Sequence, residues 1–214
     1  MTIVLIAIIV LVFYIGLRRQ RLRHRQDFIL SYVFDPSIDR QLQHTYPHLS
    51  PQQRQQVLAT LKDYFLFCVM AEYKGLGMLS MPSQAVDEAW HAFILSTKAY
   101  DRFCRRAFGY FLHHHPAETM LSPTQATKGI KRTWNLACQH EVINPDTPNR
   151  LPRIFALDAQ LAIANGFIYH LDCMKANHQE SYCGSHIGSG CGGGSCSGDS
   201  SADSGCSGGC GGGD

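Results

Sequence analysis

Apolar and polar residues are distributed along this chain in three different ways. Residues 3–17 form an unbroken apolar run without a charged side chain. Over 26–182, apolar positions instead recur about every 3.6 residues, the period of a helix that buries one face. Toward the C-terminus, glycine and serine replace them. The pattern predicts an apolar helix and a basic flank within 1–25, a folded domain over 26–182 and a tail over 183–214.

Start and stop signals divide the middle segment into helices. Pro51 after Ser50 suits the first turn of a helix, and Gly75 suits its end. Further starts are predicted at Ser83, Thr97, Pro123 and Ile154, with stops at Gly109 and Asn165. The helix after Pro123 should bury a stripe of Ile130, Trp134, Cys138 and Val142. Strand-like alternation is scarce, and only the run 167–171 is open between a strand and a helical turn. We therefore expect a compact all-α domain of about five helices.

The apolar run is the length of a short membrane span. A helix of about 17 residues rises roughly 25 Å. A cleaved signal peptide would need a positive N-terminal region and a small-residue cleavage site, which 1–25 does not offer, and a buried core helix would not need the flank. Five arginines follow the run: Arg18, Arg19, Arg21, Arg23 and Arg25. The positive-inside rule then predicts a single span in the lipid bilayer, with the rest of the chain in the cytoplasm.

The distribution of charged residues along the chain indicates which partners to expect. The formal net charge is +2. The arginine flank is positive and the tail is negative through Asp199, Asp203 and Asp214, which leaves the middle segment near neutrality. We expect no nucleic-acid partner, because no basic face remains.

The tail carries five of the nine cysteines, at 183, 191, 196, 206 and 210. It has too little apolar surface to offset backbone entropy, so we expect it to be disordered. The spacing lacks the paired cysteines of a zinc ribbon. A flexible tail, soft-metal binding, redox chemistry and enzymatic modification all stay open.

Ionisable and aromatic residues are crowded between 81 and 116. Asp87 and His91 are four residues apart on a predicted helix and therefore share a face. Such a pair can enter one metal shell, or it can be a buried hydrogen-bonded pair that joins two helices. A run of three histidines, 113–115, follows the stop at Gly109, and successive side chains there point in different directions. One or two of them could meet the pair.

The phrase A-V-D-E-A-W-H-A-F-I-L at 85–95 resembles the glycine-rich domain-containing protein family, known from plants and from short bacterial membrane-attached relatives. Tyr100, Cys104, Gly109 and the Gly/Cys-rich C-terminus fit the same pattern. Phe93 stands where the plant pattern has a second histidine. The resemblance implies that His113 is the favoured histidine of the run, and it implies no particular activity.

Combining these residues gives a candidate site for Zn²⁺ or another transition metal. Zn²⁺ takes three or four nitrogen, oxygen or sulfur ligands. We expect Asp87, His91 and His113, with Cys104 or alternatively His114 as the fourth ligand. Cys68 and Cys138 are expected to be core residues instead, because a free cysteine packs as a small apolar side chain.

Two functional classes fit the sequence. The first is a membrane-anchored binding or scaffold protein that docks a protein partner and is linked to metal or redox chemistry. The second is a metal-dependent hydrolase or modifying enzyme in which Asp87 or His91 acts as the general base. A serine nucleophile elbow, a P-loop and a dinucleotide fingerprint are all missing from the sequence, which favours the binding class.

Overall fold

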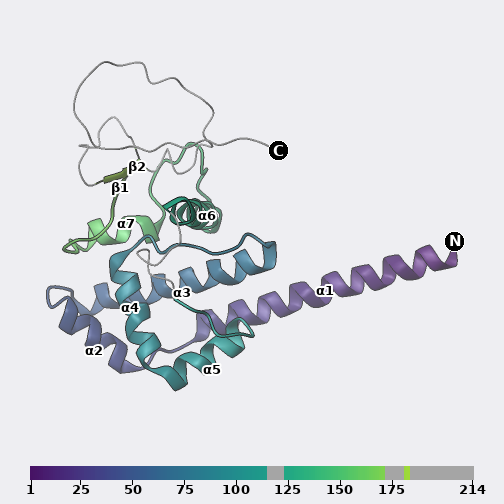
Figure 1. Ribbon diagram of the computed structural model, residues 1–214, viewed down its shortest axis with the longest axis horizontal. Helices are drawn as coiled ribbons and strands as arrows, with labels where there is room; N and C mark the ends of the chain where they lie inside the picture. The colour runs from purple at the N-terminus through teal and green to yellow at the C-terminus, as the bar shows by residue number, and fades with distance from the viewer. Residues whose placement is uncertain (115–122, 172–180, 184–214) are drawn as a thin grey trace, which may run out of the picture.

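The computed structural model describes residues 1–114, 123–171 and 181–183. Within them the chain forms seven helices and two short strands (Figure 1). The elements are α1 (Thr2–Ser31), α2 (Pro36–Thr45), α3 (Pro51–Lys74), α4 (Gln84–Leu95), α5 (Thr97–Ala107), α6 (Pro123–Glu141), α7 (Arg153–Gln160), β1 (Ile168–His170) and β2 (Ser181–Cys183). The predicted all-α fold is confirmed. Beyond Cys183, the predicted tail lies outside the described residues, as do Cys173 and His115.

Helix α1 joins the apolar run to the domain without a break. Its apolar half projects away from the other helices, with its side chains exposed (Figure 1). It is long and apolar enough to cross a membrane, although a signal sequence near the N-terminus meets the same description. The helix continues past residue 25 and enters the core, where Ile29 is fully buried and Phe28 and Tyr32 contact the Phe103 ring. The apolar run and the domain are thus connected by one rigid element.

Helix α3 is the long central helix, and its ends carry the predicted signals. The Ser50 hydroxyl accepts a hydrogen bond from the Gln53 N–H at 3.3 Å, and the Gln53 side chain accepts one from the Ser50 N–H at 2.8 Å. This reciprocal capping box satisfies two backbone donors at the first turn. Gly75 ends the helix in the left-handed region, with φ of 67°. The predicted bounds are confirmed.

Helix α2 was not among the predicted helices. It is short, and it begins where the Asp35 carboxylate accepts a hydrogen bond from the Ser37 N–H at 2.8 Å, with Pro36 in the first turn. A bidentate pair between Arg54 on α3 and Asp39, at 2.9 and 3.2 Å, joins it to α3. The Asp-Pro signal at 35–36 could have revealed this helix.

Aromatic rings pack where α1, α3, α4 and α5 meet. The Phe65 ring lies 4.9 Å from that of Phe103 and 6.3 Å from that of Phe93, between centroids. Helix α5 then ends at Ala107, and Gly109 adopts φ of 85°, as its predicted stop position requires. This aromatic core fixes α4 and α5 relative to each other.

The last part of the described domain differs from the prediction in detail. Helix α6 ends at Glu141, and Val142 adopts φ of 56° and is 94% exposed, so it does not extend the predicted stripe. Helix α7 ends at Gln160 rather than near 164. The open run at 167–171 contains β1, which pairs in parallel with β2.

Candidate metal centre

A single buried carboxylate, that of Asp158 on α7, holds the N-terminal end of α4. It accepts hydrogen bonds from the Ser83 hydroxyl at 2.6 Å and from the N–H groups of Gln84, Ala85 and Phe167 at 2.6, 3.2 and 3.0 Å. Asp158 is only 2% exposed. A negative charge here also complements the helix dipole. We call these five residues the Asp158 junction. It sets where α4 begins and therefore where its later side chains lie.

One turn further along α4, three potential metal ligands converge. Asp87 Oδ1 lies 2.7 Å from His114 Nε2, and Asp87 Oδ2 lies 3.8 Å from His91 Nε2. The two histidine rings are 4.4 Å apart between centroids. One ligand atom from each residue lies within 4.8 Å of the others. We call these three residues the Asp87 cluster. Two of them come from one helix face, and the third comes from the segment that follows α5.

Two buried aromatic side chains hold that segment against α4. The indole N–H of Trp90 donates to the Tyr100 hydroxyl at 3.0 Å, and this hydroxyl donates to the Leu112 carbonyl at 2.5 Å. The Trp90 ring also lies 4.5 Å from the His114 ring, edge to face. Because both aromatic side chains are fixed in the core, Leu112 is fixed, and with it the approach of His114 to Asp87.

Exposure is graded across the cluster. The side chains of His114, Asp87 and His91 are 9%, 20% and 44% exposed. Nearby, burial together with the charges of Glu88, Asp158 and Asp87 raises the pKa of Tyr46 to about 12. Carboxylates that disfavour a phenolate in this way favour a cation for the same reason. The cluster is therefore a partly open site in negatively charged surroundings.

The structure brings together only part of the predicted ligand set. Asp87 and His91 lie together as expected, and His114 joins them. The side chain of His113 instead lies against the Phe111 ring, at 4.9 Å, and is exposed. Cys104 is fully buried beside Tyr100 and the Leu112 backbone, and burial raises the pKa of its thiol. A protonated, buried thiol is a poor metal ligand.

The alternative of a buried Asp87–His91 hydrogen bond is wrong. At 3.8 Å the contact is too long for one, and His91 is almost half exposed. Asp87 is instead hydrogen-bonded to His114.

Two imidazole nitrogens and one carboxylate oxygen suit a borderline metal ion such as Zn²⁺. In a tetrahedral Zn²⁺ site two ligand atoms lie about 3.4 Å apart, since each bond is about 2.1 Å long. The ligand atoms of the cluster are spread over as much as 4.8 Å, so the most distant pair must close by about 1.4 Å. The exposed His91 side chain can supply this closure by rotation. Three protein ligands leave at least one position for water or for a group from outside the domain.

The three cysteines whose side chains the structure describes offer little redox chemistry. Cys138 is buried, as predicted, and Cys68 packs against the core while remaining partly exposed. Burial raises the pKa of Cys68 to about 12 and that of Cys138 to about 11. Thiols of this kind are rarely ionised at neutral pH, so they are slow to react.

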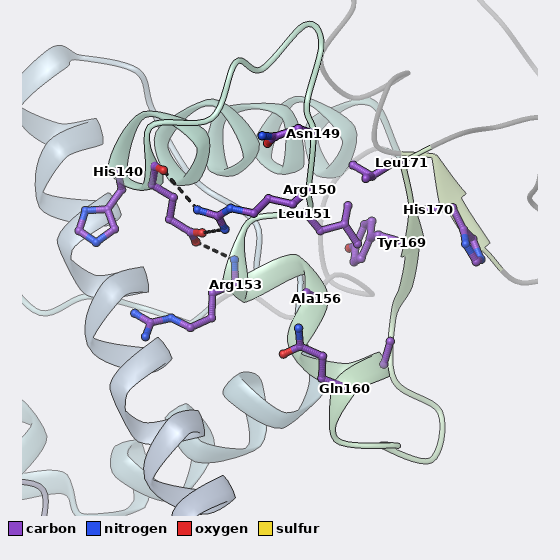
Figure 2. A pocket seen from close by; sticks show the side chains of 12 residues that line it. His140, Asn149, Arg150, Leu151, Arg153, Ala156, Gln160, Tyr169, His170 and Leu171 are labelled. Atoms are coloured by element: carbon purple, nitrogen blue, oxygen red, sulfur yellow. Dashed lines mark hydrogen bonds and ion pairs between the residues drawn. The ribbon is translucent and has the colours of Figure 1, made fainter.

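An open cleft of about 990 Å³ lies elsewhere, between the end of α6, α7 and β1 (Figure 2). Its two arginines are each paired with a carboxylate. Arg150 contacts Glu141, and Arg153 contacts Asp63. No member of the Asp87 cluster lines the cleft. The cleft is large, but its two arginines are already neutralised by carboxylates. The Asp87 cluster is therefore the better candidate for a binding site.

No curated protein and no solved structure matches the chain. A family model named UCP032817-like matches residues 24–187, a range that includes the Asp158 junction and the Asp87 cluster. The expected relation to the glycine-rich domain-containing proteins is therefore wrong, because the matching model is a different one. The local phrase around Trp90 and His91 was too short to decide between families. The chain belongs to the UCP032817-like family.

Proposed function

We propose that this chain is a single-span membrane protein whose cytoplasmic helical domain binds a transition-metal ion at the Asp87 cluster. The observation that carries the proposal is the convergence of Asp87, His91 and His114, with ligand atoms within 4.8 Å of one another. Zn²⁺ is the best fit to this ligand set. The position left open suits a ligand from a protein partner, which makes metal-dependent binding the favoured activity.

The membrane part of the proposal is supported by α1. Its apolar residues are exposed over the whole run, and five arginines follow at once. Such residues are retained on the cytoplasmic side of a span. A C-terminal reporter fusion tests the orientation. A reporter that works only outside the cytoplasm would contradict it.

Metal binding is tested on the full chain purified in detergent. The protein is stripped with a chelator, incubated with Zn²⁺, desalted and assayed by mass spectrometry for bound metal. We expect His114→Ala to lower the bound Zn²⁺ by close to one ion per chain relative to the wild type, whatever the tail cysteines bind. The adjacent His113→Ala is the matched control and should bind like the wild type. Equal losses in the two variants, or no bound metal at all, would contradict the proposed site.

A second candidate is a metal-dependent hydrolase, which the exposure of His91 and the open coordination position favour. A metal ion lowers the pKa of a bound water and so generates hydroxide near neutral pH. Asp87 and His91 would then be ligands rather than general bases, since their lone pairs are engaged. Zn²⁺-dependent cleavage of an activated ester that disappears in His114→Ala, but not in His113→Ala, would favour this candidate.

A further inference from the structure

One exposed loop lies at the same level as the end of the apolar run. The Arg18 guanidinium, directly after the last apolar residue Leu17, lies 5.0 Å from the ring centroid of Tyr73. Tyr73 belongs to the last turn of α3. The loop 75–78 follows immediately, and Figure 1 shows this end of α3 on the side toward which α1 projects. If α1 spans a bilayer, the loop reaches the headgroup layer beside it.

The chemistry of the loop fits that layer. Leu76 and Met78 are both exposed, whereas the next residue, Leu79, is buried. Gly75 and Gly77 have φ of 67° and 78°, so the loop turns tightly and presents the two apolar side chains outward.

Two cationic side chains adjoin the loop, and a tyrosine precedes it. The Arg132 side chain donates to the Met78 carbonyl at 3.0 Å, and Lys74 precedes the loop. Tyrosines prefer the membrane interface, and Tyr14 and Tyr73 both lie beside Arg18. Apolar side chains with lysine and arginine around them are the pattern that binds an anionic lipid surface.

A second loop, which follows α5 and contains Gly109 and Tyr110, lies further along α1. Gly109 is close to Arg25: a Cβ atom added at Gly109 would be 3.2 Å from the Arg25 guanidinium. Arg25 is seven residues beyond Arg18, which is about 10 Å along the helix. Tyr110 is therefore further from the apolar run than Met78 is.

We infer that the loop 75–78 rests in the headgroup layer of the leaflet from which α1 emerges, so that the domain lies against the bilayer rather than hanging free of it. This inference rests on the proposed span. It commits to a lipid surface containing anionic headgroups as the occupant of the loop.

Tryptophan fluorescence of the full chain in liposomes tests it. The lipids are phosphatidylcholine and phosphatidylglycerol, brominated either near the headgroup or deep in the acyl chain. The native Trp90 and Trp134 are buried and supply a constant background. Ile9→Trp, in the middle of the apolar run, reports on the span. Met78→Trp reports on the loop and Tyr110→Trp on the second loop. Leu95→Trp is the control, at the exposed end of α4 away from the free end of α1 (Figure 1).

The expected loss of fluorescence with headgroup-proximal bromine is strong for Met78→Trp, weaker for Tyr110→Trp and absent for Leu95→Trp. Deep bromine should quench Ile9→Trp alone. If Ile9→Trp is quenched but Met78→Trp is quenched no more than Leu95→Trp, the inference is overturned and the span stands. If Ile9→Trp is not quenched, the span and the inference are both overturned. Circular dichroism melting confirms that each variant is folded, and Leu76→Trp repeats the measurement should Met78→Trp fail to fold.

Discussion

Two carboxylates near the start of α4, that of Asp158 on α7 and that of Asp87 on α4 itself, have different roles. Asp158 is enclosed, and every contact at the Asp158 junction comes from a hydroxyl or a backbone N–H that needs an acceptor. Asp87 is partly open, and its two neighbours are imidazoles that can give up a proton and take a metal ion. The difference shows that a buried carboxylate whose neighbours are all hydrogen-bond donors stabilises the fold and cannot bind anything else. A carboxylate whose neighbours are imidazoles remains available to bind a metal ion.

The first prediction concerns the structural carboxylate. Asp158→Ala leaves the buried Ser83 hydroxyl and helix N–H groups without an acceptor, and we expect a loss of about 3 kcal/mol. For a chain of this size the melting temperature should fall by roughly 6–12 °C. Thermal unfolding followed by circular dichroism measures it. The exposed Asp146→Ala is the control, and an equal fall in melting temperature for both variants would show that Asp158 contributes no more to the fold than a surface carboxylate does.

The second prediction concerns the open carboxylate and its metal. Zn²⁺ at about a hundred times its Kd should stabilise the wild type by about 2.7 kcal/mol. Asp87→Ala and His114→Ala should each lose this Zn²⁺-dependent stabilisation, whereas Asp158→Ala, if folded, should retain it. The readout is the shift of melting temperature on adding Zn²⁺ and its reversal by a chelator. A shift that persists in His114→Ala would place the metal elsewhere.

The third prediction perturbs the Asp158 junction without removing its carboxylate. A Cβ at Gly166 would lie 2.8 Å from the Asp158 Cβ and 3.0 Å from Ile163. Gly166→Ala should therefore displace Asp158 and cost about 1–2 kcal/mol. Gly16→Ala on α1, where nothing lies within 4 Å, should cost no stability and can gain up to about 1 kcal/mol, because alanine favours a helix. Chemical denaturation of both variants tests the difference, and an unaltered midpoint for Gly166→Ala would show that the junction is adaptable.

The smallest expected effect is the coupling between Asp87 and His91 in the absence of metal. Their 3.8 Å contact is open to water, so a double-mutant cycle should give less than about 0.5 kcal/mol. With Zn²⁺ present, the two alanine changes should instead be strongly non-additive, because either one destroys the site. A large coupling without metal would mean that the pair is structural, as the Asp158 junction is.

Local signals in the sequence predicted the elements well and the tertiary partners poorly. The start at Pro51 after Ser50, the stop at Gly75 and the stop at Gly109 each act within a few residues, so periodicity and end signals were sufficient. Asp158 was missed because its partners at the start of α4 are more than 70 residues away in the chain. Nothing in its own neighbourhood marks it.

The histidine run at 113–115 shows the same limit of sequence-based prediction, because the sequence does not tell which histidine contacts Asp87. The sequence could say that one or two of the residues 113–115 meet α4, since neighbouring side chains of an extended segment point apart. Which one does so depends on how Tyr100 holds the Leu112 carbonyl, and that is a tertiary contact. The prediction of Asp87 and His91 as neighbours needed only helix geometry, and it agrees with the structure.

Helix α1 runs without interruption from the exposed apolar residues to the buried Ile29. Leu17 and Ile29 are therefore about 18 Å apart along one stiff axis, with no hinge between them. If α1 spans a bilayer, a hydrocarbon layer thinner than the apolar run would make α1 tilt. That tilt would turn the whole domain by the same angle and change the direction of the Asp87 cluster. Through the continuous helix α1, the thickness of the hydrocarbon layer would then determine the direction in which the cluster faces.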